Sequence, residues 1–432
     1  MRSRVGRWVF GALWLSAIWR TADAQPPDDM PRVARLVERL GDASFAEREI
    51  ATMELASLGR DARAQLQAAL DSPDVEVRIR ARKLLELLAV EDLWTGSFYT
   101  PEIETRPALE HFEAIAAQSE NRLLLGERYA GLPNGLVTLN AEPLLFWPAM
   151  DAVCGQIDCR FRAHYELLSP GLAIVSGRCG QNPLAYAGPL RAQLTSARRL
   201  FQEDIDYSTA VAEREHVFQI QLEMIWEDRF QLVAHRAQPI VVRAVTDNGQ
   251  QVASEQPSGG AWNVVTAGAH YTSATLRLHP PPVNATQLAE LTVAWELIAV
   301  GDLAELAFDP RQDRDTHFQD DAAITVNNCR QEPGGRVELE LTIARDLPIP
   351  DPQEMVFQEN RFTLLDANGE RYRRHGQSHA LTPEGAQYKL TFIAPGASSE
   401  PALLQVKYPR IRSRRALELV FHDVPLPHAR PD

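Results

Sequence analysis

The spacing of hydrophobic residues changes twice along this chain. Residues 31–90 carry apolar side chains three and four positions apart, and residues 107–179 mix that spacing with alternation. From Arg214 onward, apolar residues mostly alternate with polar ones. Spacing of three and four places side chains on one face of a helix, whereas alternation places them on one face of a strand. The pattern predicts a multidomain protein with all-helical, α+β and all-β parts.

Residues 28–90 are predicted to form four short helices. Ser44 and Glu47 have the spacing of a capping box, in which each side chain bonds an unpaired amide of the first turn. Gly59 suits the end of the same helix, because glycine readily adopts the left-handed conformation. Pro73 suits the first turn of the last helix, where its missing N–H loses no hydrogen bond.

Two of these helices share a sequence pattern. Arg48 and Ala51 recur as Arg78 and Ala81, a shift of 30 residues. The stretches that contain them, residues 42–58 and 72–88, resemble the HEAT-type repeat, and the resemblance implies that residues 28–90 form a short α-solenoid. Because two repeats bury little core, this part should lean on a neighbouring module or a partner. The resemblance implies protein binding through a helical surface, and the alternative is a structural cap on the rest of the chain.

Residues 105–180 are predicted to form a small α+β sandwich. Helical segments at residues 108–119 and 143–157 alternate with strand-like segments at 136–140 and with a hairpin at 159–176. This module is similar to the short N-terminal domain, STN, of secretins and TonB-dependent receptors. The resemblance implies protein–protein contacts in the periplasm. No barrel or secretin ring sequence follows, so a receptor or secretion role is not expected.

The remainder is predicted to form two β-sandwiches, residues 204–308 and 320–427. Each contains alternating strands and a turn rich in Asp, Asn and Gly, at residues 247–249 and 366–369. The turn asparagine lies 31 residues after Val217 in the first set and 31 after Val337 in the second. This equal spacing favours a duplication.

Residues 1–24 are predicted to be a secretory signal peptide. Three arginines precede an apolar run at residues 8–19, and an Ala-Asp-Ala cleavage site ends at Ala24. A signal anchor is the alternative, but the run is short for a bilayer. We therefore expect cleavage after Ala24, a membrane that is not spanned, and a periplasmic or secreted protein.

The charge narrows the range of partners. The 432 residues carry a formal charge of −14, and removal of residues 1–24, with four Arg and one Asp, leaves −17. Nucleic-acid binding needs a dominant basic surface, so we exclude nucleic acid as a partner.

Four cysteines remain for an oxidising compartment. A hairpin centred on Ser169 would place Cys159 opposite Cys179, and we predict a disulfide between them. The alternative bridge joins Cys154 to Cys159, and Cys329 is then expected to stay reduced.

Two arginine clusters are the candidate binding residues. If their strands are neighbours, they would form a basic stripe for an anionic glycan or an acidic partner. The alternative is an exposed sheet face whose charges pair locally. The residues are Arg371, Arg373, Arg374, Arg410, Arg412 and Arg414.

The chain shows no catalytic motif. It contains no His-Glu-x-x-His, Gly-x-Ser-x-Gly, phosphate-binding loop or dinucleotide-binding fingerprint. The acidic segment 309–321 could hold calcium, but a solvated linker is the simpler interpretation. We expect no catalytic residues, cofactor or metal, and interpret the chain as an exported, non-catalytic binding or scaffold protein of the bacterial envelope. The alternatives are a hydrolase acting on polysaccharide or peptide, and a glycan-binding protein that uses the sandwiches.

Overall fold

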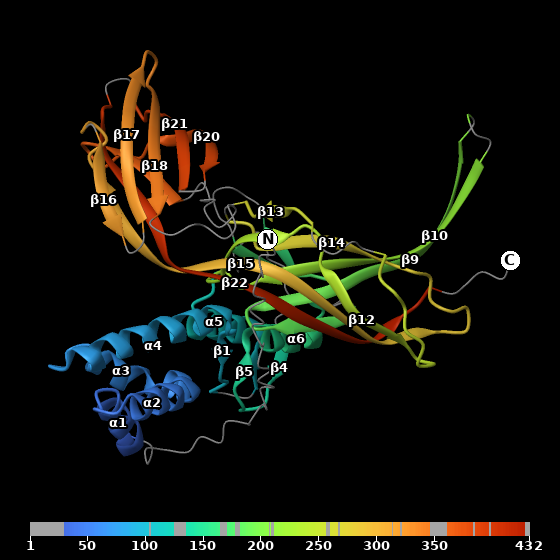
Figure 1. Cartoon of the computed structure of the whole chain (residues 1–432). Coiled ribbons are helices and arrows are strands. Elements are labelled where there is room, and N and C mark those ends of the chain that lie inside the picture. The colour runs from blue at the N-terminus through green and yellow to red at the C-terminus, as the bar shows by residue number, and fades with distance from the viewer. Residues whose placement is uncertain are drawn as a thin grey trace, which may run out of the picture. The chain divides into compact units, whose positions relative to one another are not determined.

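The computed structural model divides into two compact units, residues 1–88 and residues 89–432 (Figure 1). The predicted signal peptide lies outside the described residues. The part of the chain that the structure describes comprises residues 30–102, 105–124, 135–164, 171–177, 182–206, 208, 211–255, 260–266, 268–312, 314–319, 322–345, 361–382, 385–396 and 399–427.

The first unit is helical, as the apolar spacing predicts. It contains α1 (Met30–Arg39), α2 (Phe45–Leu58), the 3-10 turn η1 (Gly59–Ala62), α3 (Arg63–Ala69) and α4 (Val75–Trp94), whose last turn belongs to the second unit. Residues at helical spacing supply its core, which is formed by Val33, Leu36, Leu40, Ala51, Leu55, Leu66, Val77, Ala81 and Leu84. These side chains meet in one cluster, so the helices pack as a small bundle.

The predicted capping box of α2 is wrong. Ser44 is the N-cap residue, but its side chain makes no cap hydrogen bond. Its backbone N–H instead donates to the Asp42 carboxylate at 2.7 Å. Glu47 bonds Arg39 of α1 at 2.5 Å, which removes the second half of the box. A tertiary ion pair has replaced the local interaction that the sequence pattern indicates.

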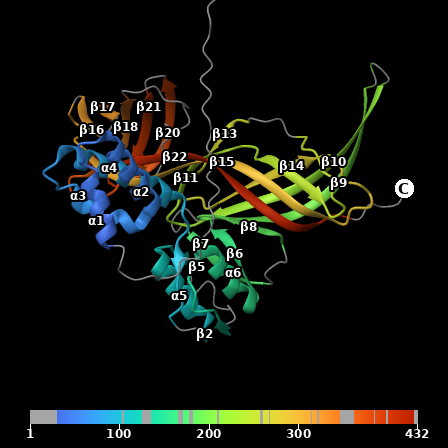
Figure 2. The same cartoon turned by 60° about the horizontal axis from the view of Figure 1, so that its bottom comes forward.

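The central module begins the second unit and mixes helices with short strands (Figure 2). Its elements are β1 (Phe98–Tyr99), β2 (Thr105–Pro107), α5 (Ala108–Ser119), β3 (Leu123–Leu124), β4 (Leu136–Thr138), β5 (Leu144–Leu145), α6 (Phe146–Gln156), β6 (Cys159–His164) and β7 (Gly171–Ser176). The strands pair as β1–β5, β2–β4 and β3–β7–β6. α5 has the predicted bounds, whereas α6 starts three residues later than predicted because residues 144–145 pair as a strand.

The first sandwich packs two sheets against each other. One sheet has the order β14–β10–β9–β8, and the other has the order β13–β11–β15–β22–β19, with β12 also paired to β15. Side chains from both sheets share one core, including Phe218, Met224, Leu291 and Trp295. The strands are β8 (Leu184–Ala187), β9 (Leu190–Asp206), β10 (Val211–Trp226), β11 (Gln231–Arg236), β12 (Ile240–Thr246), β13 (Trp262–Val264), β14 (Tyr271–Leu278), β15 (Gln287–Phe308) and β22 (Pro401–Pro425).

The second sandwich has its own sheet, β16–β17–β18–β21–β20, which faces β19 and the adjoining ends of β15 and β22. Phe308, Leu339, Phe362, Leu390 and Val406 contribute to its separate core. The strands are β16 (Asp315–Gln319), β17 (Ala322–Glu332), β18 (Arg336–Arg345), β19 (Phe362–Asp366), β20 (Arg373–Thr382) and β21 (Gly385–Ile393). Since β16 lies within residues 309–321, this segment is not simply a linker.

The two sandwiches are not arranged in tandem as predicted. β15 and β22 pair along almost their whole length and run from one sandwich into the other (Figure 1). Leu404 and Val406 of β22 lie in the second core, whereas Leu419 and Phe421 lie in the first. The predicted boundary of 320–427 is therefore wrong at its C-terminal end, because the last strand returns to the first sandwich.

A buried carboxylate joins the central module to the first sandwich. Glu227 is fully buried and pairs with Arg229 at 2.7 Å. It also accepts hydrogen bonds from the backbone N–H of Ser97 at 2.9 Å, from Ser97 Oγ at 2.5 Å and from Asn121 Nδ2 at 3.1 Å. Four donors therefore satisfy its two oxygens, as burial of a charge requires.

Candidate protein-contact site on the helical unit

α2 and α4 carry apolar side chains on their exposed faces as well as on their buried ones. Ala51 and Leu55 of α2 lie in the core, whereas Phe45 is 65% exposed and Met53 is 63% exposed. Phe45 and Met53 are eight positions apart and therefore lie along the same side of the helix. On α4, Ile79 is 56% exposed. We name the outward surface of α2 and α4 the α2–α4 face.

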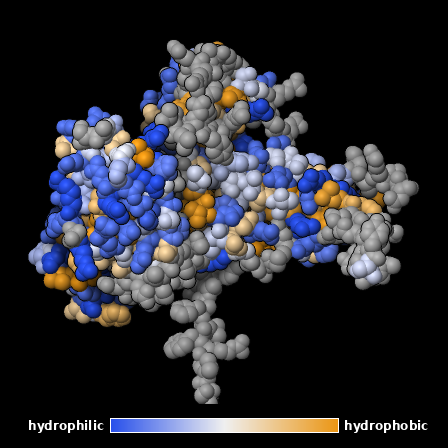
Figure 3. All heavy atoms as spheres, turned by 90° about the horizontal axis from the view of Figure 1, so that it is seen from above, coloured by the Kyte–Doolittle hydropathy of each residue, from blue (hydrophilic) through white to orange (hydrophobic). Residues whose placement is uncertain are grey.

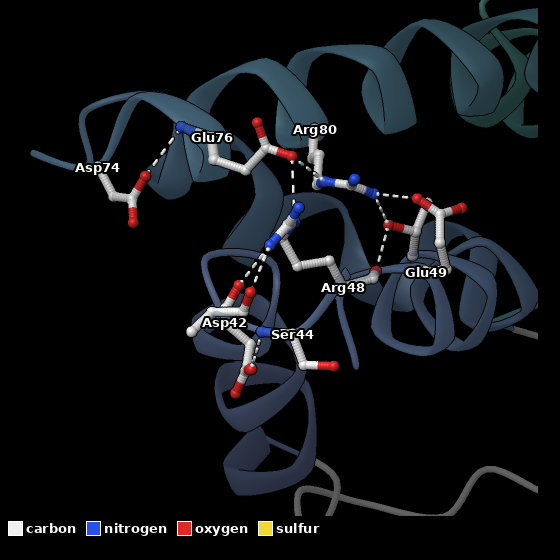
Figure 4. Close-up of polar contacts among 9 residues, drawn as sticks. Asp42, Ser44, Arg48, Glu49, Asp74, Glu76 and Arg80 are labelled. Atoms are coloured by element: carbon white, nitrogen blue, oxygen red, sulfur yellow. Dashed lines mark hydrogen bonds and ion pairs between the residues drawn. The ribbon is translucent and has the colours of Figure 1, made fainter. Parts of the chain in front are cut away.

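Ion pairs hold the two helices together at this face. Arg80 of α4 bonds Glu76 of its own helix at 2.6 Å and reaches across to Glu49 of α2 at 2.8 Å. Arg48 of α2 reaches in the opposite direction to Glu76, at 3.3 Å (Figure 4). The two arginines and two glutamates therefore alternate in charge across the helix pair. The hydrogen bonds that Arg80 donates to Glu76 and Glu49 raise the pKa of its guanidinium group.

Arg48 and Arg80 also fix the surroundings of Phe45. Their guanidinium carbons lie 5.6 Å and 6.0 Å from the centroid of the ring. A cation over an aromatic face at an exposed site contributes about 0.5–1 kcal/mol. Phe45 is thus exposed to solvent while two arginines restrain it, and an ordered aromatic side chain loses little conformational entropy when a partner binds.

The 30-residue repeat has a direct structural meaning. The Nη1 atom of Arg48 donates to the carbonyl oxygens of residues 42 and 43, at 2.7 Å and 3.2 Å. Arg78 makes the same pair of bonds to residues 72 and 73, at 2.6 Å and 3.0 Å. Each arginine therefore ties its helix to the loop before it, at offsets of six and five residues. This equivalence extends the sequence match to a shared hydrogen-bonding role.

The arginines of the two predicted clusters do not form one stripe. Arg373 and Arg374 begin β20, an edge strand of the five-stranded sheet, whereas Arg410, Arg412 and Arg414 lie on β22 of the other sheet. Because β20 pairs with β21 and not with β22, the two runs are not neighbouring strands. The predicted stripe is therefore wrong. Arg371 bonds Thr363 of β19 at 3.4 Å.

Individual arginines of these clusters have local partners. Arg414 bonds Glu296 at 2.5 Å, and Arg236 bonds the same carboxylate at 2.7 Å. Burial alone would raise the pKa of Glu296, but these two arginines hold it below its ordinary value. Both guanidinium groups also lie over the Trp262 ring, at 4.3 Å for Arg236 and 5.2 Å for Arg414. On the face shown in Figure 3, hydrophilic side chains predominate and hydrophobic ones form small separate groups.

The predicted disulfide register also differs. Cys159 pairs with Ser176 across the β6–β7 hairpin, so the expected register opposite Cys179 is wrong, and Cys179 itself lies outside the described residues.

In the acidic segment, Asp309 bonds Arg311 and Asp315 pairs with His317, while residues 313, 320 and 321 are outside the described part. Among the described residues, no group of His, Cys, Asp and Glu is placed to hold a metal ion. No helix in the described part is long and apolar enough to cross a membrane.

The sequence pattern predicted a helical contact surface but did not identify the residues of the α2–α4 face. Phe45 and Met53 lie off the stripe formed by Ala51 and Leu55, and this displacement is the signal that could have identified them. The charge network could not be found in this way, because its members are 31 residues apart in the case of Arg80 and Glu49.

Comparisons with known proteins do not assign a family. No family model and no curated protein matches the chain. One solved structure, described as the conserved domain protein from Bacillus anthracis, is similar at 8% identity and covers 56% of this chain and 89% of its own. Its TM-score is 0.17, so the similarity carries no argument about fold or function.

Proposed function

We propose that this protein is an exported, non-catalytic binding or scaffold protein of the bacterial envelope, and that it binds a protein partner through the α2–α4 face. The observation that carries the proposal is the exposure of Phe45 beside the Arg48 and Arg80 ion pairs, together with the exposure of Met53 and Ile79 on the same two helices. In protein interfaces, a few aromatic or arginine side chains become buried when the partner binds, and polar residues surround them. α2 and α4 carry both kinds of side chain at exposed positions.

We further infer that α1–α4 form two HEAT-type repeats and that the central module is of the STN type. The matched bonds of Arg48 and Arg78 support the first inference. The order of helices and strands in residues 105–176 supports the second. In this proposal the central module provides a further protein contact, and the sandwiches act as spacers.

The partner is expected to cover Phe45 with apolar side chains and to place polar groups at the edge of the face. Truncation of a central aromatic anchor costs about 2 kcal/mol of binding free energy, or about a 30-fold loss of affinity. The fold should not suffer in the same way, because substitutions at exposed positions usually change stability by about 0.5 kcal/mol or less.

The test is capture of partners from envelope extract by the mature chain, residues 25–432. A Phe45→Ala/Met53→Ala variant should lose a partner that the parent chain captures. Phe318→Ala is the matched control, because Phe318 of β16 is 82% exposed and lies in the strand-rich unit. Circular dichroism should show that both variants remain folded.

Equal capture by the parent and by the double variant would overturn the role of the α2–α4 face. Retention on an anionic wall polymer with no captured protein would overturn protein scaffolding and favour glycan binding. Export is tested separately by fractionation of cells that express the full chain. The periplasmic or secreted form should begin at Gln25, and a cytoplasmic chain that keeps residues 1–24 would contradict export.

A further inference from the structure

The central module contains two cysteines that meet in its core. Cys154 lies in the last turn of α6, and Cys159 is the first residue of β6. Both are fully buried, and their Sγ atoms are 2.7 Å apart. The short connection between them includes Asp158, which has a positive φ of 51°. This turn reverses the chain and brings the end of the helix and the start of the strand together.

The distance between the sulfurs is short for atoms that are not bonded. Carbon atoms in contact are about 3.5–4.0 Å apart, and sulfur is the larger atom. The surroundings are apolar, since Val153, Ile157, Leu172 and Ile174 belong to the same core cluster. Metal binding does not explain the pair, because no metal-binding group of His, Cys, Asp and Glu occurs among the described residues.

We propose that Cys154 and Cys159 form a structural disulfide in the mature protein. The bond fixes the end of α6 to the start of β6, at the turn between the second helix and the closing hairpin of the central module. The proposal rests on the proposed function only in that export would deliver the chain to an oxidising compartment. The geometry itself does not depend on export.

The oxidant is a second disulfide, either of a thiol oxidase or of glutathione. One cysteine thiolate attacks this disulfide and releases the first oxidant thiol, which leaves a mixed disulfide. The other cysteine then attacks the sulfur of the first cysteine in this mixed disulfide. The attack forms the Cys154–Cys159 bond and releases the second oxidant thiol. The protein loses two electrons and two protons, and the oxidant gains both. Because both sulfurs are buried in the folded module, the exchange takes place while the module folds.

The geometry of the described residues does not favour Cys179 or Cys329 as the disulfide partner of Cys159. The β6–β7 register places Ser176 opposite Cys159, and β7 ends at this residue. Cys329 lies on β17 and packs against the core of the second sandwich, whereas Cys154 and Cys159 lie together in the core of the central module.

The test is disulfide mapping of the mature chain after refolding with oxidised and reduced glutathione. Remaining thiols are blocked with N-ethylmaleimide before digestion. Trypsin alone leaves both cysteines in one peptide, since no Lys or Arg lies between them, so an endoprotease that cuts before Asp is added. The expected product is residues 151–157 linked to residues 158–160, together with blocked Cys329.

Two variants make the result specific. Cys179→Ala should keep the linked product, and Cys154→Ala should lose it. Linkage of residues 158–160 to a peptide that contains Cys179 would overturn the proposal, as would blockage of all four cysteines in the refolded parent chain. Failure of export is distinguishable, because the purified chain would still form the bond in glutathione while the chain isolated from cells would not.

Discussion

The buried Glu227 provides a quantitative test of how the central module is attached to the first sandwich. We consider Glu227→Gln, which keeps the shape of the side chain but removes its charge. The carboxylate accepts bonds from Arg229, from Asn121 and from both the backbone and the hydroxyl of Ser97. An amide replaces one accepting oxygen with a donor, so at least one buried donor loses its partner and Arg229 loses its counter-charge.

The cost follows from these lost contacts. A hydrogen bond to a charged group contributes about 1.5–3 kcal/mol, and breaking a buried ion pair costs about 3–5 kcal/mol. We expect Glu227→Gln to lower the free energy of unfolding by about 3 kcal/mol. For a cooperative unit of roughly 220 residues, this corresponds to a fall of about 6 °C in the unfolding midpoint.

The assay is thermal unfolding at neutral pH, with Glu305→Gln as the control. Glu305 pairs with Lys407 at 3.3 Å on the surface, where an exposed ion pair contributes about 0–1 kcal/mol, so this variant should unfold close to the parent chain. A Glu227→Gln midpoint within about 1 °C of the control would refute the reasoning, because it would mean that the buried carboxylate is not needed to satisfy its donors.

Two further predictions concern the sandwiches. Leu419→Ala should lower the free energy of unfolding of the first sandwich by about 2–5 kcal/mol, because Leu419 lies in its core. Amide hydrogen exchange should become faster in β10 and stay unchanged in β18 of the second sandwich. Faster exchange in β18 alone would contradict the placement of Leu419 in the first core. Burial lowers the pKa of His235, which also bonds the Arg236 carbonyl and Thr272 Oγ1. Below about pH 6.5, His235 is protonated in the unfolded chain but stays neutral in the folded protein, where its pKa is lower. The unfolding midpoint should therefore fall as pH drops through this value, and by less in His235→Gln; equal slopes for both proteins would contradict this.

Local spacing predicted the helices and many of the strands well. Phe112 and Ile115 recur at helical spacing after Pro107, and α5 has the expected bounds. Phe218 and Ile220 alternate with polar residues, and they lie on the buried face of β10. In such segments each residue's environment depends mainly on its near neighbours, so the sequence pattern is sufficient.

Partners between distant segments could not be predicted from spacing. Leu404 and Leu419 stand in similar alternating stretches of β22, but they lie in different cores. Alternation shows which face of a strand is buried and does not identify the strand beside it. The register of the β6–β7 hairpin was missed for a related reason, because the position of the turn centre determines which residues are opposite.

The path of β22 sets the order in which the strand-rich unit can be completed. Val293 of β15 pairs with Leu419, 126 positions later, and the whole second sandwich lies between them in sequence. The entropic cost of closing this connection rises only with the logarithm of its length, and it is smaller once the intervening residues have folded. The first sandwich can therefore close only after β22 has been made, although most of its strands come earlier. A chain that ends before Ile411 would leave residues 287–301 of β15 without their β22 partners, and so would disrupt the first sandwich more than the second.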